Sequence, residues 1–285
     1  MRFEVTHLTK FIYSRPVFLE PHEVRLRPRC DSWQNLLSFK IHVDPSPAGI
    51  THNIDLHNNS STRMWFNGTH KSLIITTAFS VETLRTDPFD FIVDSQALVL
   101  PVNYSDEDSD SLAPFREVSN FSVDVKNLAK SISNDAKNET LAFLVSLNQR
   151  IHETIEPIFR AVGDPWPAST TLEKRKGSCR DQSVLFIAVC RTVGLAARFV
   201  SGYQEGDYQR AKRELHAWAE VYLPGAGWRG YDPMSGLVIS DRHVAVASGH
   251  IPSAAAPTSG TFRGTNVEST MRTQIDIEVQ PVRQV

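Results

Sequence analysis

The sequence has few cysteines and no long apolar run, and each shortage excludes a class of protein. Its 285 residues include only Cys30, Cys179 and Cys190, too few and odd in number for a disulfide framework. On one helix, Cys179 and Cys190 would lie about 16 Å apart, too far to bridge. We therefore expect reduced thiols and a cytoplasmic location. With no run of about eighteen apolar residues and no apolar signal-peptide segment, we expect neither a membrane span nor a leader.

The patterns typical of nucleic-acid, metal and cofactor binding are also missing. Lys and Arg number 30 against 32 Asp and Glu, and the short basic run at 174–176 is typical of a solvated surface. The ten histidines show no metal-ligand spacing, and no Cys-x-x-Cys pair or phosphate-binding loop occurs. We predict no nucleic-acid partner, no metal and no organic cofactor.

The first hundred residues have the pattern of β-strands. Apolar residues alternate with polar ones over residues 37–43, the period of a half-buried strand. Asn67-Gly68 stands between two strand-like runs, a sequence typical of hairpin turns. We predict a β-rich, sandwich-like domain over residues 1–115.

The remaining residues mix helices with strands. Residues 104–111 are polar and acidic, which predicts an exposed loop or linker, and helical spacing follows over 140–155. Residues 180–193 are apolar on nearly every side, which predicts a buried helix capped by Gly194. Strands are expected at 196–203, 216–223, 228–232 and 271–279. We predict an α+β domain over 116–285 that includes this C-terminal strand.

Cys179 is the strongest candidate for a nucleophile. It stands at the beginning of the predicted buried helix, where free amides and the helix dipole favour a thiolate and later an oxyanion. A free cysteine is more often buried and inert, which is the interpretation that we give to Cys190. Cys30 has no plausible base near it in the sequence.

A nucleophilic cysteine needs a base, and the base needs a group that orients it. His216 begins one predicted strand and Asp232 ends the next, so both lie at the same end of a hairpin. A symmetric turn would set them a few residues out of register, which a bulge in the Gly-rich turn would correct. Taken alone, His216 is equally consistent with an ordinary strand-end histidine, and Asp232 is consistent with an ordinary turn residue. The hypothesis therefore rests on the three residues together.

Several blocks of sequence resemble the transglutaminase-like core. They are residues 177–181 (Gly-Ser-Cys-Arg-Asp), 191–203, 216–222 (His-Ala-Trp-Ala-Glu-Val-Tyr) and 228–233 (Trp-Arg-Gly-Tyr-Asp-Pro). Residues 5–13 and 21–29 resemble the β-rich domain that precedes this core in bacterial members. The resemblance implies a papain-like α+β fold, with Cys179 as nucleophile, His216 as base and Asp232 as orienting group.

The resulting hypothesis is acyl transfer or hydrolysis at a carboxamide or peptide bond of a protein or peptide substrate. Trp166, between two prolines, and Ser178 are candidates to line the cleft or hold an oxyanion; for Trp166, simple packing is the alternative. A non-catalytic protein- or peptide-binding module that keeps the fold is the competing hypothesis. A serine hydrolase is disfavoured because no Gly-x-Ser-x-Gly sequence occurs.

Overall fold

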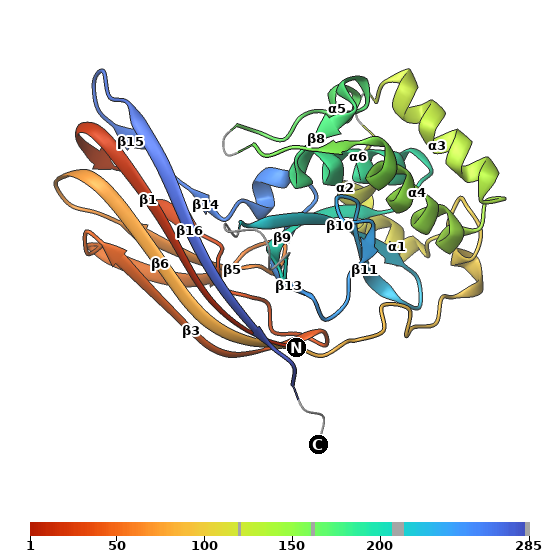
Figure 1. Ribbon diagram of the computed structural model, residues 1–285, viewed down its shortest axis with the longest axis horizontal. Helices are drawn as coiled ribbons and strands as arrows, with labels where there is room; N and C mark the ends of the chain where they lie inside the picture. The colour runs from red at the N-terminus through yellow and green to blue at the C-terminus, as the bar shows by residue number, and fades with distance from the viewer. Residues whose placement is uncertain (119–120, 161–162, 207–213, 283–285) are drawn as a thin grey trace.

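The structure is a computed structural model that describes residues 1–118, 121–160, 163–206 and 214–282. A strand-rich part and a helix-rich part lie side by side in it (Figure 1). The α+β architecture and the β-rich N-terminal half are therefore as predicted. Among the described residues, no helix combines the length and the apolar character needed to cross a membrane.

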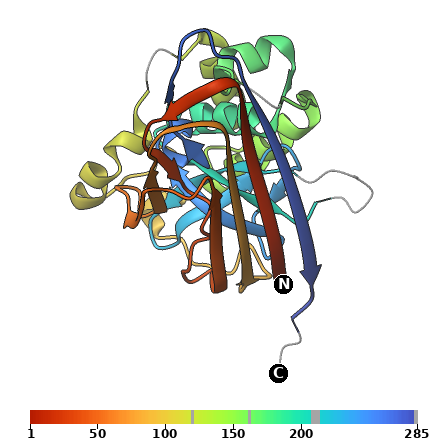
Figure 2. The same ribbon diagram turned by 90° about the vertical axis from the view of Figure 1, so that its left-hand side faces the viewer.

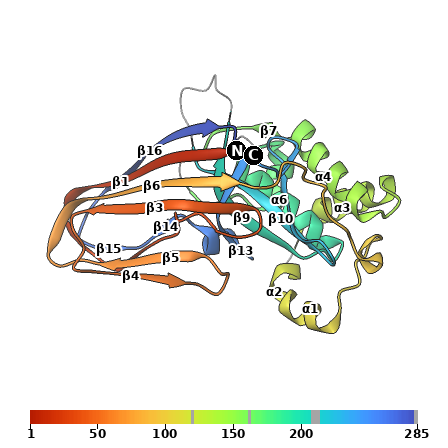
Figure 3. The ribbon, with the colours of Figure 1, turned by 90° about the horizontal axis from the view of Figure 1, so that it is seen from below.

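The strand-rich part contains two stacked sheets (Figure 3). The first sheet has the order β15-β1-β6-β3, with β16 also paired to β1, and the second has the order β14-β2-β5-β4. The strands are β1 (Arg2–Leu19), β2 (His22–Val24), β3 (Gln34–Asp44), β4 (Gly49–Ile54), β5 (Ser60–Trp65), β6 (Thr69–Thr83), β14 (Thr258–Ser259), β15 (Phe262–Arg263) and β16 (Ser269–Gln280).

The two sheets pack through side chains that alternate along their strands. Leu73 and Ile75 of β6 point inwards with neighbours at intermediate exposure between them, the period-two pattern of a half-buried strand. Met64 of β5 and Val24 of β2 meet them from the second sheet in one buried cluster. Burial of these apolar faces stabilises the sandwich.

The chain returns to the first sheet at its C-terminal end. β16 pairs antiparallel with β1 from Arg2↔Gln280 to Tyr13↔Ser269, and the two strands run alongside each other in Figure 2. From its place in the sequence, this strand was predicted to belong to the second domain. In the structure it completes the sheet that the first residues begin.

The Asn67-Gly68 hairpin prediction was wrong. β5, before this pair, belongs to the second sheet, and β6, after it, belongs to the first, so the two strands are not paired. Gly68 does adopt a left-handed conformation, with φ of 75°. The turn therefore connects one sheet to the other. The turn residues alone do not determine whether the two flanking strands pair with each other.

The acidic segment at 104–111 is also not a simple loop. It contains helix α1 (Asp106–Ser111), whose N-cap Ser105 accepts a hydrogen bond from the amide of Asp108. Three acidic residues in its first turn interact favourably with the helix dipole. The preceding Tyr104 is buried and donates its hydroxyl to the carbonyl of Tyr222. The segment is thus tied to the second part of the molecule.

The helix-rich part contains a sheet of order β12-β11-β10-β9-β13. Its main strands are β9 (Ala197–Gln204), β10 (His216–Leu223), β11 (Gly227–Asp232), β12 (Leu237–Val238) and β13 (His243–Gly249). Its helices are α2 (Ala113–Arg116), α3 (Val123–Asp135), α4 (Thr140–Thr154), α5 (Ala168–Lys174) and α6 (Cys179–Thr192). Short elements complete it: η1 (Ser95–Ala97), η2 (Pro252–Ala255), β7 (Glu156–Pro157) and β8 (Lys176–Gly177).

Helix α6 is the centre of this part. It packs against β9 and β10 on one side and contacts α3, α4 and α5 elsewhere. Leu185, Phe186 and Val189 are fully buried, as expected for a helix that is apolar nearly all round. Gly194, with φ of 86°, follows the helix and ends it as predicted.

The two parts share a buried interface. Phe3 and Phe79 of the first sheet belong to the same hydrophobic cluster as Phe199 of β9. Within it, His7 Nδ1 lies 2.8 Å from the hydroxyl of Tyr203, and both side chains are buried. The N-terminal sheet therefore packs against β9. β9 in turn pairs with β10, the strand that carries His216.

Candidate active site

Cys179 is the first residue of α6, and its neighbours hold that helix end in place. Ser178 is the N-cap, and the carboxylate of Asp181 accepts hydrogen bonds from the Ser178 amide and hydroxyl, both at 2.8 Å. Serine at the N-cap with an acidic residue three positions later is the capping-box pattern. The amide of Cys179 lies in the first turn, whose N–H groups have no acceptor inside the helix. It is thus available to a bound anion.

The same carboxylate fixes the loop that carries Trp166. Asp181 Oδ1 accepts hydrogen bonds from the Trp166 amide at 2.7 Å and from Arg160 Nη1 at 2.6 Å. Burial opposes ionisation of Asp181, but the hydrogen bonds from Trp166, Ser178 and Arg160 hold its pKa below the usual value. One buried carboxylate thus joins the loop to the beginning of the helix.

Ser178 directly precedes Cys179, and Trp166 is joined to the beginning of α6 through Asp181, and the contacts of both residues are structural. The guanidinium of Arg160 lies 4.3 Å from the centroid of the Trp166 indole ring, and the ammonium of Lys174 lies 5.3 Å from it. The Ser178 hydroxyl is occupied by Asp181 and buried. A role for either side chain in holding an oxyanion stays a prediction.

His216 and Asp232 form a hydrogen bond from neighbouring strands. His216 Nε2 lies 2.8 Å from Asp232 Oδ2, and the carboxylate is fully buried. The β10–β11 ladder runs without a shift from Leu223 opposite Gly227 to Ala219 opposite Tyr231. The same register, extended by one residue, would put Trp218 and not His216 opposite Asp232. The expected misregister is present, and no bulge corrects it. The histidine instead reaches its partner diagonally, a span within reach of long side chains on adjacent strands.

Asp232 has further donors, which keep it ionised and oriented. Its carboxylate accepts hydrogen bonds from the Ser235 hydroxyl at 2.6 Å and the Met234 amide at 3.1 Å. Burial favours the neutral acid, but the charges and hydrogen bonds of His216 and His243 lower the pKa of Asp232 far below its usual range. A fixed carboxylate therefore faces His216.

The second ring nitrogen of His216 is available to Cys179. Burial alone would lower the pKa of His216, yet the charge of Asp232 and hydrogen bonds to Asp232 and Cys179 raise it well above 6.5. Because Nε2 faces Asp232, Nδ1 is the nitrogen left for the thiol. The three residues predicted from the sequence are thus brought together in one place.

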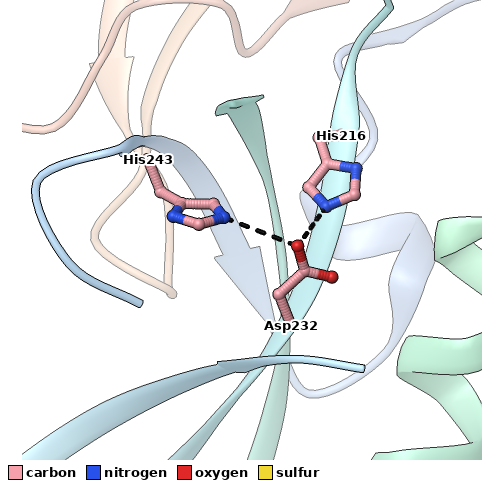
Figure 4. Close-up of side chains that lie close together, drawn as sticks. All are labelled: His216, Asp232 and His243. Carbon is pink, nitrogen blue, oxygen red and sulfur yellow. Dashed lines mark hydrogen bonds and ion pairs between the residues drawn. The ribbon is translucent and has the colours of Figure 1, made fainter. Parts of the chain in front are cut away.

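Sequence reasoning missed His243, the first residue of β13. Its Nε2 lies 3.5 Å from Asp232 Oδ2, so two imidazoles converge on one carboxylate oxygen (Figure 4). Burial lowers the pKa of His243, and its Nδ1 has no partner among the described residues. No local motif marks this residue, because the β13–β9 pairing that delivers it links segments far apart in sequence.

His216, Asp232 and His243 are also a set of metal-ligand types. Their ligand atoms lie within 4.8 Å of one another. Zinc bonds of about 2.0–2.1 Å in a tetrahedron would hold two ligand atoms more than 3 Å apart. The 2.8 Å between His216 Nε2 and Asp232 Oδ2 is instead a direct hydrogen bond. The geometry favours a proton-handling pair over a metal centre.

The other two cysteines lie in different environments. Cys190 is fully buried in α6, and that burial raises the pKa of its thiol well above the usual value. Cys30 is exposed, with its sulfur 3.7 Å from the side-chain oxygen of Asn35. Neither has an imidazole partner within the described part of the chain.

Two family models match separate parts of the chain. Residues 126–233 match the transglutaminase-like superfamily, and residues 3–82 match the bacterial transglutaminase-like N-terminal region. Residues 126–233 thus form a transglutaminase-like core, preceded by the N-terminal region that bacterial proteins of this kind carry. The matched core contains Cys179, His216 and Asp232, but ends before His243.

Relatives that align over nearly the whole chain include uncharacterised mycobacterial proteins. The one from Mycobacterium leprae is 23% identical over 99% of both chains, and the one from Mycobacterium tuberculosis is 26% identical over 97% of this chain and 92% of its own. A protein-glutamine gamma-glutamyltransferase of Pseudomonas aeruginosa is 33% identical, over 32% of this chain and 15% of its own.

A solved structure shares the complete fold. It is a crystal structure described as that of a candidate cysteine protease from Cytophaga hutchinsonii, with a TM-score of 0.73 and 21% identity. The match covers 99% of this chain and 92% of the other. It shows that the β-rich part and the transglutaminase-like core occur together as one architecture.

Proposed function

We propose that this protein transfers or hydrolyses acyl groups through a Cys179 thioester, with His216 as acid and base and Asp232 as its orienting group. One observation carries the proposal: the His216 imidazole lies between a thiol at the beginning of α6 and a buried carboxylate. A nucleophile, a base that interacts with it and a group that orients the base are the parts that covalent catalysis requires.

The first half-reaction forms the thioester. The Cys179 thiolate attacks the carbonyl carbon of a carboxamide or peptide bond, and the Cys179 amide stabilises the negative oxygen. As the intermediate collapses, the C–N bond breaks and the imidazolium of His216 gives its proton to the departing amine. Asp232 keeps the ring oriented and stabilises its positive charge throughout.

The second half-reaction decides the class of enzyme. A primary amine that attacks the thioester gives a new amide and makes the protein a transglutaminase, whereas water gives a carboxylic acid and makes it a peptidase or amidase. In either case His216 takes the proton of the attacking group. The name of the Pseudomonas relative supports the amine, and a protein or peptide substrate suits both outcomes.

A single comparison tests the proposal. Wild type and Cys179→Ala are incubated with a glutamine-containing peptide, with and without a primary amine, and products are followed by mass spectrometry. We expect amine incorporation, deamidation or cleavage by wild type and none by Cys179→Ala. A Cys30→Ala variant is the matched control, because that thiol lies outside the site. Equal product from wild type and Cys179→Ala would contradict the assignment.

Thiol labelling separates an enzyme from a non-catalytic binding module with the same fold. Iodoacetamide alkylates thiolates rather than thiols. At a limiting amount near pH 6, we expect it to modify Cys179 and to leave Cys30 and Cys190 unmodified. Equal labelling of Cys30 and Cys179 in the folded protein would favour the binding module. A cytoplasmic location remains part of the proposal, since a reducing compartment keeps a nucleophilic thiol unoxidised.

A further inference from the structure

The first sheet ends on one side at β16, a strand of 12 residues (Figure 2). β16 pairs with β1 along its whole length and without a shift in register, and no strand in the described part of the chain pairs with its other edge. An unpaired edge presents a row of backbone N–H and C=O groups, which natural sheets usually protect with short strands or bulges. β16 is neither short nor bulged. Its free edge is therefore a regular template for another strand.

The backbone groups on that free edge belong to the odd-numbered residues of β16. Next to the pair Tyr13↔Ser269, the amide of Ser14 donates to the carbonyl of Glu268, so even-numbered residues of β16 bond to β1. Bonded and non-bonded pairs alternate along an antiparallel ladder. The residues that direct their N–H and C=O groups away from β1 are therefore Met271, Thr273, Ile275, Ile277 and Val279.

The even-numbered side chains bring like charges together within one chain. Glu4 of β1 lies opposite Glu278 of β16, and Lys10 lies opposite Arg272. Like charges directly opposite each other destabilise a sheet. Glu4 has an ion-pair partner in Arg2, but neither Arg272 nor Glu278 forms an ion pair with a described residue. The edge thus has an acidic end and a basic end, and its own chain neutralises neither.

We propose that β16 pairs with the β16 of a second copy of this chain, antiparallel about a two-fold axis at Ile275. In this register Arg272 lies opposite Glu278 of the second copy, and Gln274 lies opposite its Asp276. The two-fold axis makes each of these contacts twice. Odd-numbered residues face odd-numbered residues, so the outward N–H and C=O groups of both strands bond to each other.

The charges favour this register over its neighbours. A shift of the axis by two residues also pairs the outward backbone groups, so hydrogen bonding alone does not choose. With the axis at Ile277, Asp276 lies opposite Glu278 of the second copy. With the axis at Thr273, Glu268 lies opposite Glu278. Both alternatives oppose like charges, whereas the proposed register opposes a base to an acid at two places.

The other face of the edge gains apolar contact in the same register. Met271, whose side chain is 42% exposed, lies opposite Val279 of the second copy, and Thr273 lies opposite its Ile277. Side chains directly opposite each other have Cβ atoms about 4.5–5.5 Å apart, which is close enough for contact. The second copy therefore covers an apolar side chain that the single chain leaves open. The pairing uses no candidate catalytic residue, so it does not depend on the proposed function.

Sedimentation equilibrium of the full chain tests the proposal. We expect a dimer of twice 32.0 kDa that dissociates on dilution. Arg272→Glu or Glu278→Arg opposes like charges at two places and should raise the dissociation constant at least about tenfold. The double variant restores both charge pairs and should return to within about threefold of wild type. Lys130→Glu, the same charge change on the exposed side of α3, is the control and should dimerise as wild type does.

The variants should leave the fold of the single chain intact. Arg272→Glu places an acid opposite Lys10, which replaces a like-charge pair with an opposite-charge pair. Thr273→Pro removes an outward N–H that β1 does not use, and should also prevent dimerisation. Circular dichroism checks the fold of each.

Two kinds of result would overturn the proposal. A wild-type chain that stays monomeric up to about 0.5 mM would do so, and would leave the edge to an extended strand of another protein. A dimer that neither Arg272→Glu nor Thr273→Pro weakens would place the contact elsewhere on the molecule. Single variants that weaken the dimer without recovery in the double variant would likewise exclude the proposed register.

Discussion

His216 and Asp232 are bonded across two strands although they are not opposite each other. The β10–β11 ladder ends with Ala219 opposite Tyr231, so its register does not put His216 opposite Asp232. His216 spans the diagonal and places its Nε2 at 2.8 Å from Oδ2. Asp232 is the last residue of β11, and the amide of Met234 then donates to its free oxygen. The turn therefore holds the carboxylate aimed at the histidine rather than at solvent.

Asp232→Asn is expected to abolish most activity while the fold is kept. The amide no longer supplies the negative charge that stabilises the imidazolium, and it presents either an oxygen or an N–H to His216 Nε2. We expect kcat/KM to fall by about a thousandfold or more, most of it in kcat. Steady-state kinetics measure this, with circular dichroism as the control for folding. A loss confined to KM would contradict the orienting role.

The raised pKa of His216 predicts how stability and activity vary on the alkaline side. Its folded pKa lies well above the ordinary 6.5, so the charged imidazole stabilises the fold fully below about pH 6.5. That contribution is lost as pH rises through the folded pKa. We expect kcat/KM to decline over the same alkaline range, because the acid that protonates the leaving amine disappears.

The Asp232→Asn variant provides the control for that alkaline limb. Without the carboxylate, the pKa of His216 falls, and the alkaline decline of the residual activity should move to lower pH. Profiles of kcat/KM against pH, recorded for both proteins in the same buffers, give the comparison. An alkaline limb at the same pH in both proteins would show that another group controls it.

His243 is expected to act as a positioning residue. Its distance of 3.5 Å from Asp232 Oδ2 indicates a weak bond, so His243→Phe should lower kcat/KM by about threefold to tenfold and leave KM unchanged. His243→Gln keeps an N–H donor and should recover much of the loss. Equal rates for His243→Phe and wild type would show that His216 and Ser235 hold the carboxylate without it.

The candidate site was predictable because its residues lie within short blocks of sequence. Cys179 follows a serine N-cap and precedes Asp181, so its position at a helix end can be read from neighbouring residues. The diagonal contact between His216 and Asp232 could not be predicted, because strand register depends on the conformation of the turn and on the packing of the paired strands. His243 was missed for the same reason, because β13 joins the sheet beside β9 and not beside its sequence neighbours.

In the first half of the chain, strands were easier to predict than their partners. Alternation over residues 37–43 indicated β3, but nothing local showed that β5 and β6 belong to different sheets. The C-terminal strand was likewise predicted as a strand, and its pairing with β1 depends on contacts more than 250 residues apart. Nonlocal pairing is decided by the whole core, which periodicity does not describe.

The buried His7 at the interface of the two parts predicts a loss of stability in acid. Burial lowers its pKa from 6.5 to about 4, so the neutral ring stabilises the fold above about pH 6.5. That stability is lost as pH falls through about 4, by on the order of 3 kcal/mol in total. Urea unfolding of wild type and His7→Gln from pH 7 to pH 4 measures it. Parallel curves for the two proteins would exclude His7 as the group responsible.

Asp181 is expected to contribute strongly to the stability of the fold. It is fully buried and joins the Ser178 N-cap, the Trp166 amide and Arg160, so Asp181→Ala leaves several donors unpaired at once. Removal of one partner of a buried ion pair costs about 3–5 kcal/mol. Urea unfolding at pH 7 should show a loss of that size, with Asp164→Ala as the exposed control. A loss below about 1 kcal/mol would mean that water replaces the carboxylate and that the loop does not depend on it.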